Sequence, residues 1–205
     1  MSSISEAHTA SVSLTVDPEA LRRFTTLLQS GIYLRTGQGT EISALLTTLP
    51  GFSMDYINNR VETVFVNGLP ADNMQQKLYG ETAVLALSAA MPGLAGAIFR
   101  KGGVHASLRT GTATGLAAAD QINTPVVVRL KLFNIIAVER GVQLLADGCT
   151  LAAAALVKFL NYRPPLTAAV TEFNIDGRSI DPEQFAAELP DSDMIHLSIR
   201  GSHGS

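Results

Sequence analysis

The feature that most constrains this chain is an internal repeat at an offset of about 110 residues. The segment GIYLRTGQGTEISALLTTL, which starts at Gly31, aligns with GVQLLADGCTLAAAALVKF, which starts at Gly141. The match continues in the same order, because VETVFVNG aligns with VTEFNIDG and Leu87-Ser88 aligns with Leu197-Ser198. Colinear identities over a domain's length favour a tandem duplication, in which each half repeats one structural unit.

Hydrophobic patterning assigns similar elements to both halves. Alternating apolar residues predict strands, Asp-Gly and Asn-Gly pairs predict hairpin turns, and Thr or Asp before an apolar run predicts a helix start. Pro18 suits the first turn of a helix that Asp17 caps. The predicted strands are 11–16, 61–66, 84–88, 126–133, 142–146, 171–175 and 194–199, with a further strand after Gly31. The predicted helices follow Asp17, span 41–49 after Thr40, span 151–160 after Thr150, and include a short one near Asp181.

This order predicts an α+β protein, in which each half folds a mixed sheet of four or five strands over one main helix. We expect a first domain over residues 10–97 and a second over residues 124–201. A glycine-rich basic segment, residues 98–123, connects them.

The second half resembles a known family. Its VRLKLF strand, the D-G-x-T sequence at Asp147, the x-I-D-G turn and the final MIHLS strand are similar to the small subunit of molybdopterin synthase and to the thiamine-pathway sulfur carrier. These are ubiquitin-like β-grasp proteins, so the resemblance implies two tandem β-grasp domains. The first half resembles the same fold through VFVNG and LALSAAMPGLAG.

The resemblance also implies a chemistry that this chain does not match. In the family, a C-terminal Gly-Gly is adenylated by a partner enzyme and converted to a thiocarboxylate, and glycine is needed because the tail threads a narrow channel. Here the second half ends RGSHGS, without Gly-Gly. A carrier function would therefore require processing that exposes a glycine tail.

The connecting segment holds the candidate binding residues. It combines positive charge with backbone donors in glycine-rich turns, a combination that can hold phosphate or carboxylate. Two other interpretations stay open: a solvated basic linker, and a ubiquitin-like tail released by cleavage after Gly103. The candidate residues for an anion or partner site are Arg100, Lys101, Gly102, Gly103, His105 and Arg109.

Composition excludes several classes. The chain has 205 residues, a net charge of −3, 46% hydrophobic and only 16% charged residues. High hydrophobicity with low charge argues against intrinsic disorder, and the acidic balance argues against general nucleic-acid binding. The single cysteine, Cys149, excludes an internal disulfide and predicts a reducing cytoplasm. The uncharged stretch 82–99 is interrupted by Pro and Gly, so we expect a strand and a loop rather than a membrane span.

Catalytic and cofactor signatures are lacking. The sequence has no HExxH, G-x-S-x-G, P-loop or dinucleotide-binding motif, so we expect no metal, no cofactor and no enzyme. Cys149 is expected to be a small turn residue and His196 a half-exposed strand residue. A mean hydropathy of +0.22 suggests further burial in a homo-oligomer. The leading hypothesis is a non-enzymatic binding protein for a protein partner or a small anion. The alternatives are a carrier and a small-molecule or enzymatic site on the Arg100–Arg109 segment.

Overall fold

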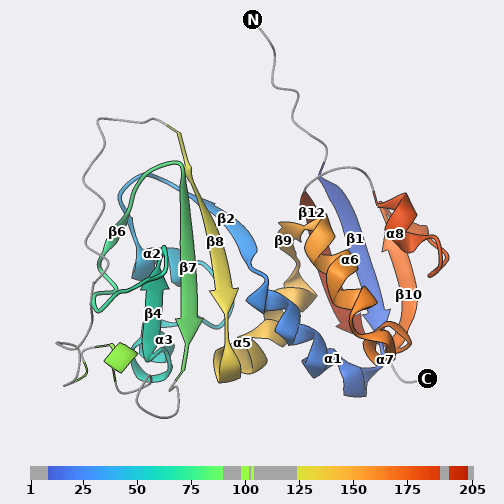
Figure 1. Cartoon of the computed structure of the whole chain (residues 1–205), viewed down its shortest axis with the longest axis horizontal. Helices are drawn as coiled ribbons and strands as arrows, with labels where there is room; N and C mark the ends of the chain where they lie inside the picture. The colour runs from blue at the N-terminus through green and yellow to red at the C-terminus, as the bar shows by residue number, and fades with distance from the viewer. Residues whose placement is uncertain (1–8, 90–97, 102, 104–123, 190–193, 203–205) are drawn as a thin grey trace, which may run out of the picture. The chain divides into compact units, whose positions relative to one another are not determined.

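A computed structural model describes residues 9–89, 98–101, 103, 124–189 and 194–202. The chain is an α+β protein with mixed sheets, as the sequence predicts (Figure 1). It divides into two compact units. Unit 1 contains residues 1–27 and 142–205, and unit 2 contains residues 28–141.

Unit 1 is built on a five-stranded sheet with the order β11-β10-β1-β12-β9. Its two central strands, β1 and β12, are parallel, and Ser13 pairs with Ser198. Strands β10 and β9 flank this pair in antiparallel orientation. The strands are β1 (Ala10–Val16), β9 (Cys149–Ala152), β10 (Val170–Ile175), β11 (Arg178–Ser179) and β12 (Met194–Gly201). The helices that lie wholly within the unit are α1 (Pro18–Phe24), α6 (Ala153–Asn161), α7 (Pro164–Thr167) and α8 (Phe185–Glu188).

Alternation along the strands produces the core of unit 1. On β1 and β12, every second side chain is apolar and buried, while Ser, Thr, His and Arg occupy the opposite face. Helices α1 and α6 add to the core through Phe24 and Phe159, whose ring centroids are 5.7 Å apart. Phe173 and Phe185 form a second ring pair at 4.8 Å.

Unit 2 is built on a five-stranded sheet with the order β2-β8-β7-β4-β5 and a separate two-stranded pair, β3-β6. Its parallel pair is β7 and β8, flanked by antiparallel β4 and β2. The strands are β2 (Ile32–Thr36), β3 (Thr40–Glu41), β4 (Thr63–Val66), β5 (Leu69–Pro70), β6 (Lys77–Leu78), β7 (Thr82–Ser88) and β8 (Val126–Leu132). The helices are α2 (Ile42–Leu46) and α3 (Met54–Arg60), and α5 (Asn134–Asp147) begins in this unit; a 3-10 turn, η1 (Thr25–Gln29), precedes β2.

The core of unit 2 lies on one face of its sheet. The buried side chains of β7 and β8 share this core with Ile42 and Leu46 of α2 and with Ile57 of α3. The Gln38 side chain connects the loop before β3 to the residues that precede β7 and β8. Its Nε2 donates to the carbonyl oxygens of Gly80 (2.8 Å) and Thr124 (2.9 Å). The opposite face of the sheet carries the residues considered below.

The strands are distributed differently from the predicted domains 10–97 and 124–201. Strand β1 lies between β10 and β12 of the second half, and β8 lies between β2 and β7 of the first half. Each repeat therefore contributes its first strand to the other repeat's sheet. Local patterning cannot predict this exchange. The strands β1 and β8 have similar apolar alternation, so the pattern alone does not determine to which sheet each strand belongs. Most of the predicted connecting segment, residues 98–123, lies outside the described residues.

Several local predictions are also corrected. The predicted strand 142–146 belongs to helix α5, which continues through Gly141 and ends before Gly148. Thr150 and Thr40 are not helix caps: each lies in a short strand, and the helices begin at Ala153 and Ile42. The apolar spacing of Leu144 and Leu145 fits either a helix or a strand, and burial against the core favours the helix here.

Other local predictions are confirmed. Helix α1 starts at Pro18 after Asp17 as predicted, but the Asp17 side chain makes no capping hydrogen bond. Two of the three predicted turns have two consecutive residues with positive φ, at Asn67-Gly68 and Asp176-Gly177. This is the geometry of type I′ turns, which match the twist of a two-stranded hairpin. The predicted turn at Asp147-Gly148 is instead the end of helix α5.

Candidate functional site

The open face of the unit 2 sheet carries the most distinctive side chains outside the core. Residues that pair across neighbouring strands lie side by side on one face. Pairing across β2, β8, β7 and β4 therefore defines three rows. The rows are Arg35–Val127–Thr82, Tyr33–Arg129–Val84, and Lys131–Ala86–Phe65. We refer to these nine residues as the basic face.

The basic face has three cations and no carboxylate. Its cations, Arg35, Arg129 and Lys131, lie on adjacent strands, and Val84 is 36% exposed between the rows. Like charges on one sheet face repel each other, and they do so more strongly than in bulk water because the dielectric constant beside the protein is lower; a bound anion offsets this repulsion. The face therefore favours the approach of a negatively charged molecule.

Arg129 is held in place by contacts with its neighbours. Its Nε donates to the Ser30 carbonyl oxygen at 2.9 Å, and its guanidinium carbon lies 5.8 Å from the centre of the Tyr33 ring. Gly31 makes room for this side chain, because a Cβ at that position would lie 2.7 Å from Cγ of Arg129. Gly31 also has φ of +101°, a conformation that favours glycine.

A cavity of about 300 Å³ opens at one end of the basic face. It lies where the carboxyl ends of the parallel strands β7 and β8 meet, and its walls are mostly apolar. Phe65, which belongs to both the face and the cavity, stacks against Phe99 with a centroid distance of 5.4 Å. The residues that line the cavity are Phe65, Ala86, Leu87, Ser88, Phe133 and Asn134.

The polar groups of the cavity come from two strand ends. Asn134 has φ of +52°, which turns the chain sharply from β8 into α5. Its side-chain Nδ2 donates to Oγ of Ser88 at 2.8 Å. Thr63, paired with Ser88 in the sheet, is buried, and its hydroxyl has no hydrogen-bond partner among the described residues. The cavity thus combines apolar walls with a small cluster of hydroxyl and amide groups.

The structure describes three of the six candidate residues from the connecting segment. Arg100 forms an ion pair of 2.7 Å with Glu62. The Lys101 backbone N–H donates to the Glu62 carbonyl oxygen at 2.6 Å, and its Nζ donates to the Ile57 carbonyl oxygen at 3.3 Å. The N–H of Gly103 donates to the carbonyl oxygen of Arg100. These contacts hold Arg100 and Lys101 against α3 and the residues just before β4.

The same contacts reduce the positive charge that the segment offers to a ligand. Glu62 neutralises Arg100, and partial burial lowers the pKa of Lys101. The remaining candidates, Gly102, His105 and Arg109, lie outside the described residues. An anion site that unites all six residues stays a prediction.

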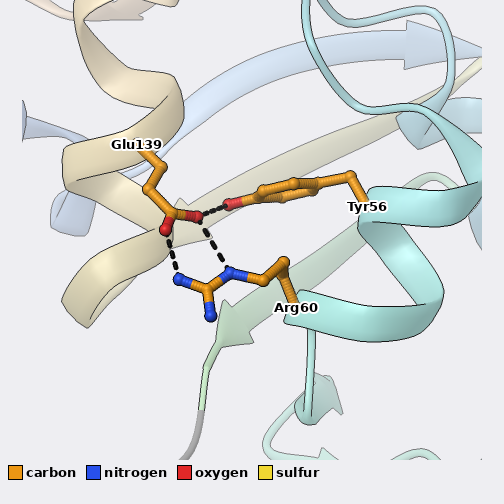
Figure 2. Close-up of polar contacts among 3 residues, drawn as sticks. All are labelled: Tyr56, Arg60 and Glu139. Carbon is orange, nitrogen blue, oxygen red and sulfur yellow. Dashed lines mark hydrogen bonds and ion pairs between the residues drawn. The ribbon is translucent and has the colours of Figure 1, made fainter.

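A polar network joins α3 to α5 in unit 2 (Figure 2). The Glu139 carboxylate accepts a hydrogen bond of 2.8 Å from the Tyr56 hydroxyl and forms an ion pair with Arg60. The guanidinium of Arg140 lies 3.6 Å from the centre of the Tyr56 ring. Burial and Glu139 together raise the pKa of Tyr56 to about 12, and Arg60 lowers the pKa of Glu139. Neither group is suited to proton transfer at neutral pH, so this network is a structural clamp.

Two other residues considered from the sequence, Cys149 and His196, lie on strands of unit 1. Cys149 begins β9, and burial raises its pKa to about 12, which makes its thiol a poor nucleophile. His196 lies on β12 beside Gly148, where an added Cβ would lie 2.4 Å from Nε2 of the imidazole. Within the described parts of the chain, no group of three His, Cys, Asp or Glu side chains is arranged to hold a metal ion. None of the described helices is long and apolar enough to cross a membrane.

Sequence patterning only partly indicated the basic face. The alternation in VVVRLKLF places Arg129 and Lys131 opposite Leu130 and Leu132. It does not show that Arg35 and Tyr33 lie beside them, because that neighbourhood depends on the strand exchange. The cavity gave no sequence signal, since its walls come from two strands, β4 and β7, and from the junction between β8 and α5.

Comparison of the chain with protein-family models, curated proteins and solved structures found no match in any of the three.

Proposed function

We propose that this protein acts by binding rather than by catalysis, and that the basic face of unit 2 binds an acidic segment of a protein partner. The observation that carries this proposal is the row arrangement of Arg35, Arg129 and Lys131 without a carboxylate among the nine residues of the face. A cationic surface of this kind attracts an acidic partner and fixes its orientation.

The dimensions of the face favour a protein segment over a small ion. Adjacent strands lie about 4.8 Å apart, so the three rows across four strands form a platform about 15 Å wide. Aromatic and aliphatic side chains lie between the cations: Tyr33 beside Arg129, and Val84 exposed next to it. Aromatic residues and arginine contribute strongly to protein interfaces, where they bury apolar area and form directed hydrogen bonds.

We also propose that the two units are variants of the β-grasp fold. This proposal is supported by the central parallel pair in each sheet, the flanking antiparallel strands, and a helix between the second and third strands. The first-strand exchange is a departure from a simple tandem arrangement. A relationship to sulfur carriers stays a proposal at the level of sequence resemblance.

The carrier alternative has less support than the binding proposal. A carrier tail has to extend away from its domain, whereas the N–H of Ser202 donates to the carbonyl oxygen of Val16 at 2.8 Å. Lys101, at the start of the other possible glycine tail, is hydrogen-bonded to Glu62 and Ile57. These contacts favour binding as the function.

Binding of a fluorescein-labelled peptide of alternating Glu and Leu tests the proposal. We expect the wild-type protein to bind it with an affinity that falls steeply between 50 and 500 mM salt, roughly as exposed charge pairs are screened. The variant Arg35→Glu/Lys131→Glu should lose this binding, because two cations become anions. The matched control is Arg23→Glu/Lys77→Glu, which makes the same charge change at exposed positions outside the face. Equal binding by both double variants would contradict the proposal.

A further inference from the structure

We infer that the cavity at the carboxyl ends of β7 and β8 binds a small molecule with an apolar body and one anionic group, a carboxylate or a phosphate. The cavity volume of about 300 Å³ is at the lower end of the range for small-molecule sites. This inference rests on the proposed function, because it makes the cavity a specific part of the same binding face.

The apolar body is argued from the walls. Phe65, Ala86 and Phe133 supply carbon surface, and the Phe65 ring is held by its contact with Phe99. An apolar group that enters such a site leaves water and gains dispersion contacts with the rings. The small side chain of Ala86 leaves the space between the two aromatic walls open.

The anionic group is argued from Lys131. The sheet register places Lys131 beside Ala86, and Ala86 beside Phe65, all on one face. A lysine side chain one strand away from the cavity can place its ammonium group at the cavity's rim. Arg129 is less suited to this role, since the Ser30 carbonyl oxygen and the Tyr33 ring already hold its guanidinium.

A third feature orients the ligand. The Ser88 hydroxyl and the Asn134 amide line the cavity and are joined by a hydrogen bond of 2.8 Å. The hydroxyl still has a donor proton and the amide oxygen still has acceptor capacity. A ligand oxygen or N–H group at this position would be recognised at a second polar point, separate from Lys131. The site therefore fits a molecule that is polar at two points and apolar between them.

The test uses two probes that differ only in charge, 4-phenylbutyrate and 4-phenylbutanol, with the full-length protein. We expect the carboxylate to bind more tightly, and the backbone amide signals of Leu87 and Ser88 to shift while that of Ser198 in the other sheet does not. Lys131→Gln should weaken phenylbutyrate about fivefold to tenfold, the effect of one charge-assisted contact, and leave phenylbutanol unchanged. Lys77→Gln, an exposed lysine on β6, is the matched control.

Filling the cavity separates this inference from the proposed function. Ser88→Leu should abolish binding of both probes and leave binding of the acidic peptide intact, because Ser88 lines the cavity but is not one of the nine residues of the basic face. If Ser88→Leu does not fold, the amide shifts of the wild-type protein decide the question. Absence of shifts at Leu87 and Ser88, or equal affinity for the two probes, would overturn the inference. If the wild-type protein binds phenylbutyrate but does not bind the acidic peptide, the proposed partner is overturned instead.

Discussion

The two sheets share a strand arrangement but differ in the side chains on the face that is not packed against the core. Each has five strands and a central parallel pair, β1 with β12 in unit 1 and β7 with β8 in unit 2. In unit 1, the open face carries small polar residues, and the Thr15 hydroxyl donates to Glu172 at 2.9 Å while Arg200 lies on its other side. In unit 2, the same face carries three cations and two aromatic rings.

The comparison shows which side chains a sheet of this kind constrains. The buried alternation is present in both sheets, because any polar substitution there would leave an unpaired group in the core. The open faces differ, near-neutral in unit 1 and basic in unit 2, since strand formation only weakly restricts their side chains. The two sheets also differ in which strand of the parallel pair lies next to the edge strand. In unit 1 the edge strand β9 pairs with β12, the last strand of the second half, and in unit 2 the edge strand β2 pairs with β8, the first strand of that half.

Cutting the chain between the repeats tests the strand exchange and should have the largest effect. Residues 1–101 and residues 124–205 each lack a central strand of a sheet, so we expect both fragments to be unfolded alone and to recover structure when mixed. The fragment 28–147 contains every strand of the unit 2 sheet and should fold alone. Circular dichroism and NMR spectra of the backbone amides measure whether each fragment is folded, alone and in the mixture. Independent folding of residues 124–205 would show that the exchange is not needed.

Gly148→Ala tests how tightly the unit 1 sheet is packed against the end of α5. Gly148 has φ of +95°, and the new Cβ would displace the exposed imidazole of His196, so we expect a loss of about 2 kcal/mol in the free energy of unfolding. Adding His196→Ala should recover part of this loss. Gly177→Ala is the control, because its φ of +77° is similar but nothing lies within 4 Å of its Cβ. It should cost about 1 kcal/mol, the conformational strain alone. Equal losses at the two glycines would remove the packing argument.

Tyr56→Phe tests the clamp between α3 and α5. It removes a hydrogen bond to a carboxylate, so we expect a loss of about 1 kcal/mol in stability. Because the pKa of Tyr56 is raised from 10 to about 12 in the folded protein, its stabilising contribution is complete below pH 10 and is lost as the pH rises from 10 to 12. Absorbance at alkaline pH should show one of the four tyrosines ionising late, and the variant should lack that phase. A late phase that persists in the variant would assign it to another tyrosine.

The smallest effect is expected at Cys149, on the edge strand of the unit 1 sheet. Burial raises its thiol pKa to about 12, so iodoacetamide at pH 8 should modify the native protein very slowly and the urea-unfolded protein rapidly. Mass spectrometry follows the single adduct. Rapid modification of the native protein would mean that β9 detaches readily from β12.

Local chemistry explains why much of the fold could be predicted and the site could not. Asn67-Gly68 and Asp176-Gly177 specify their hairpins through residues that tolerate positive φ, and the alternation of β12 specifies a half-buried strand. The second half of helix α5 is predicted as the strand 142–146, because the apolar spacing of that stretch fits either element and only packing decides between them. The basic face and the cavity depend on pairing between residues such as Tyr33 and Arg129, which are about a hundred positions apart.

The position of β1 also determines when the molecule can be completed during synthesis. Its two neighbours, β10 and β12, lie near the other end of the chain, and Ser11 bonds to Asp176 across 165 residues. On the ribosome, β1 therefore emerges before β10 and β12 and cannot pair until both have been synthesised. The entropic cost of closing the loop between these strands is high, so this pairing is slow. During that interval it is an unpaired strand, exposed to association with other chains. The serine and threonine residues on one side of β1 make such association less favourable, so the polar side of this strand also protects the nascent chain.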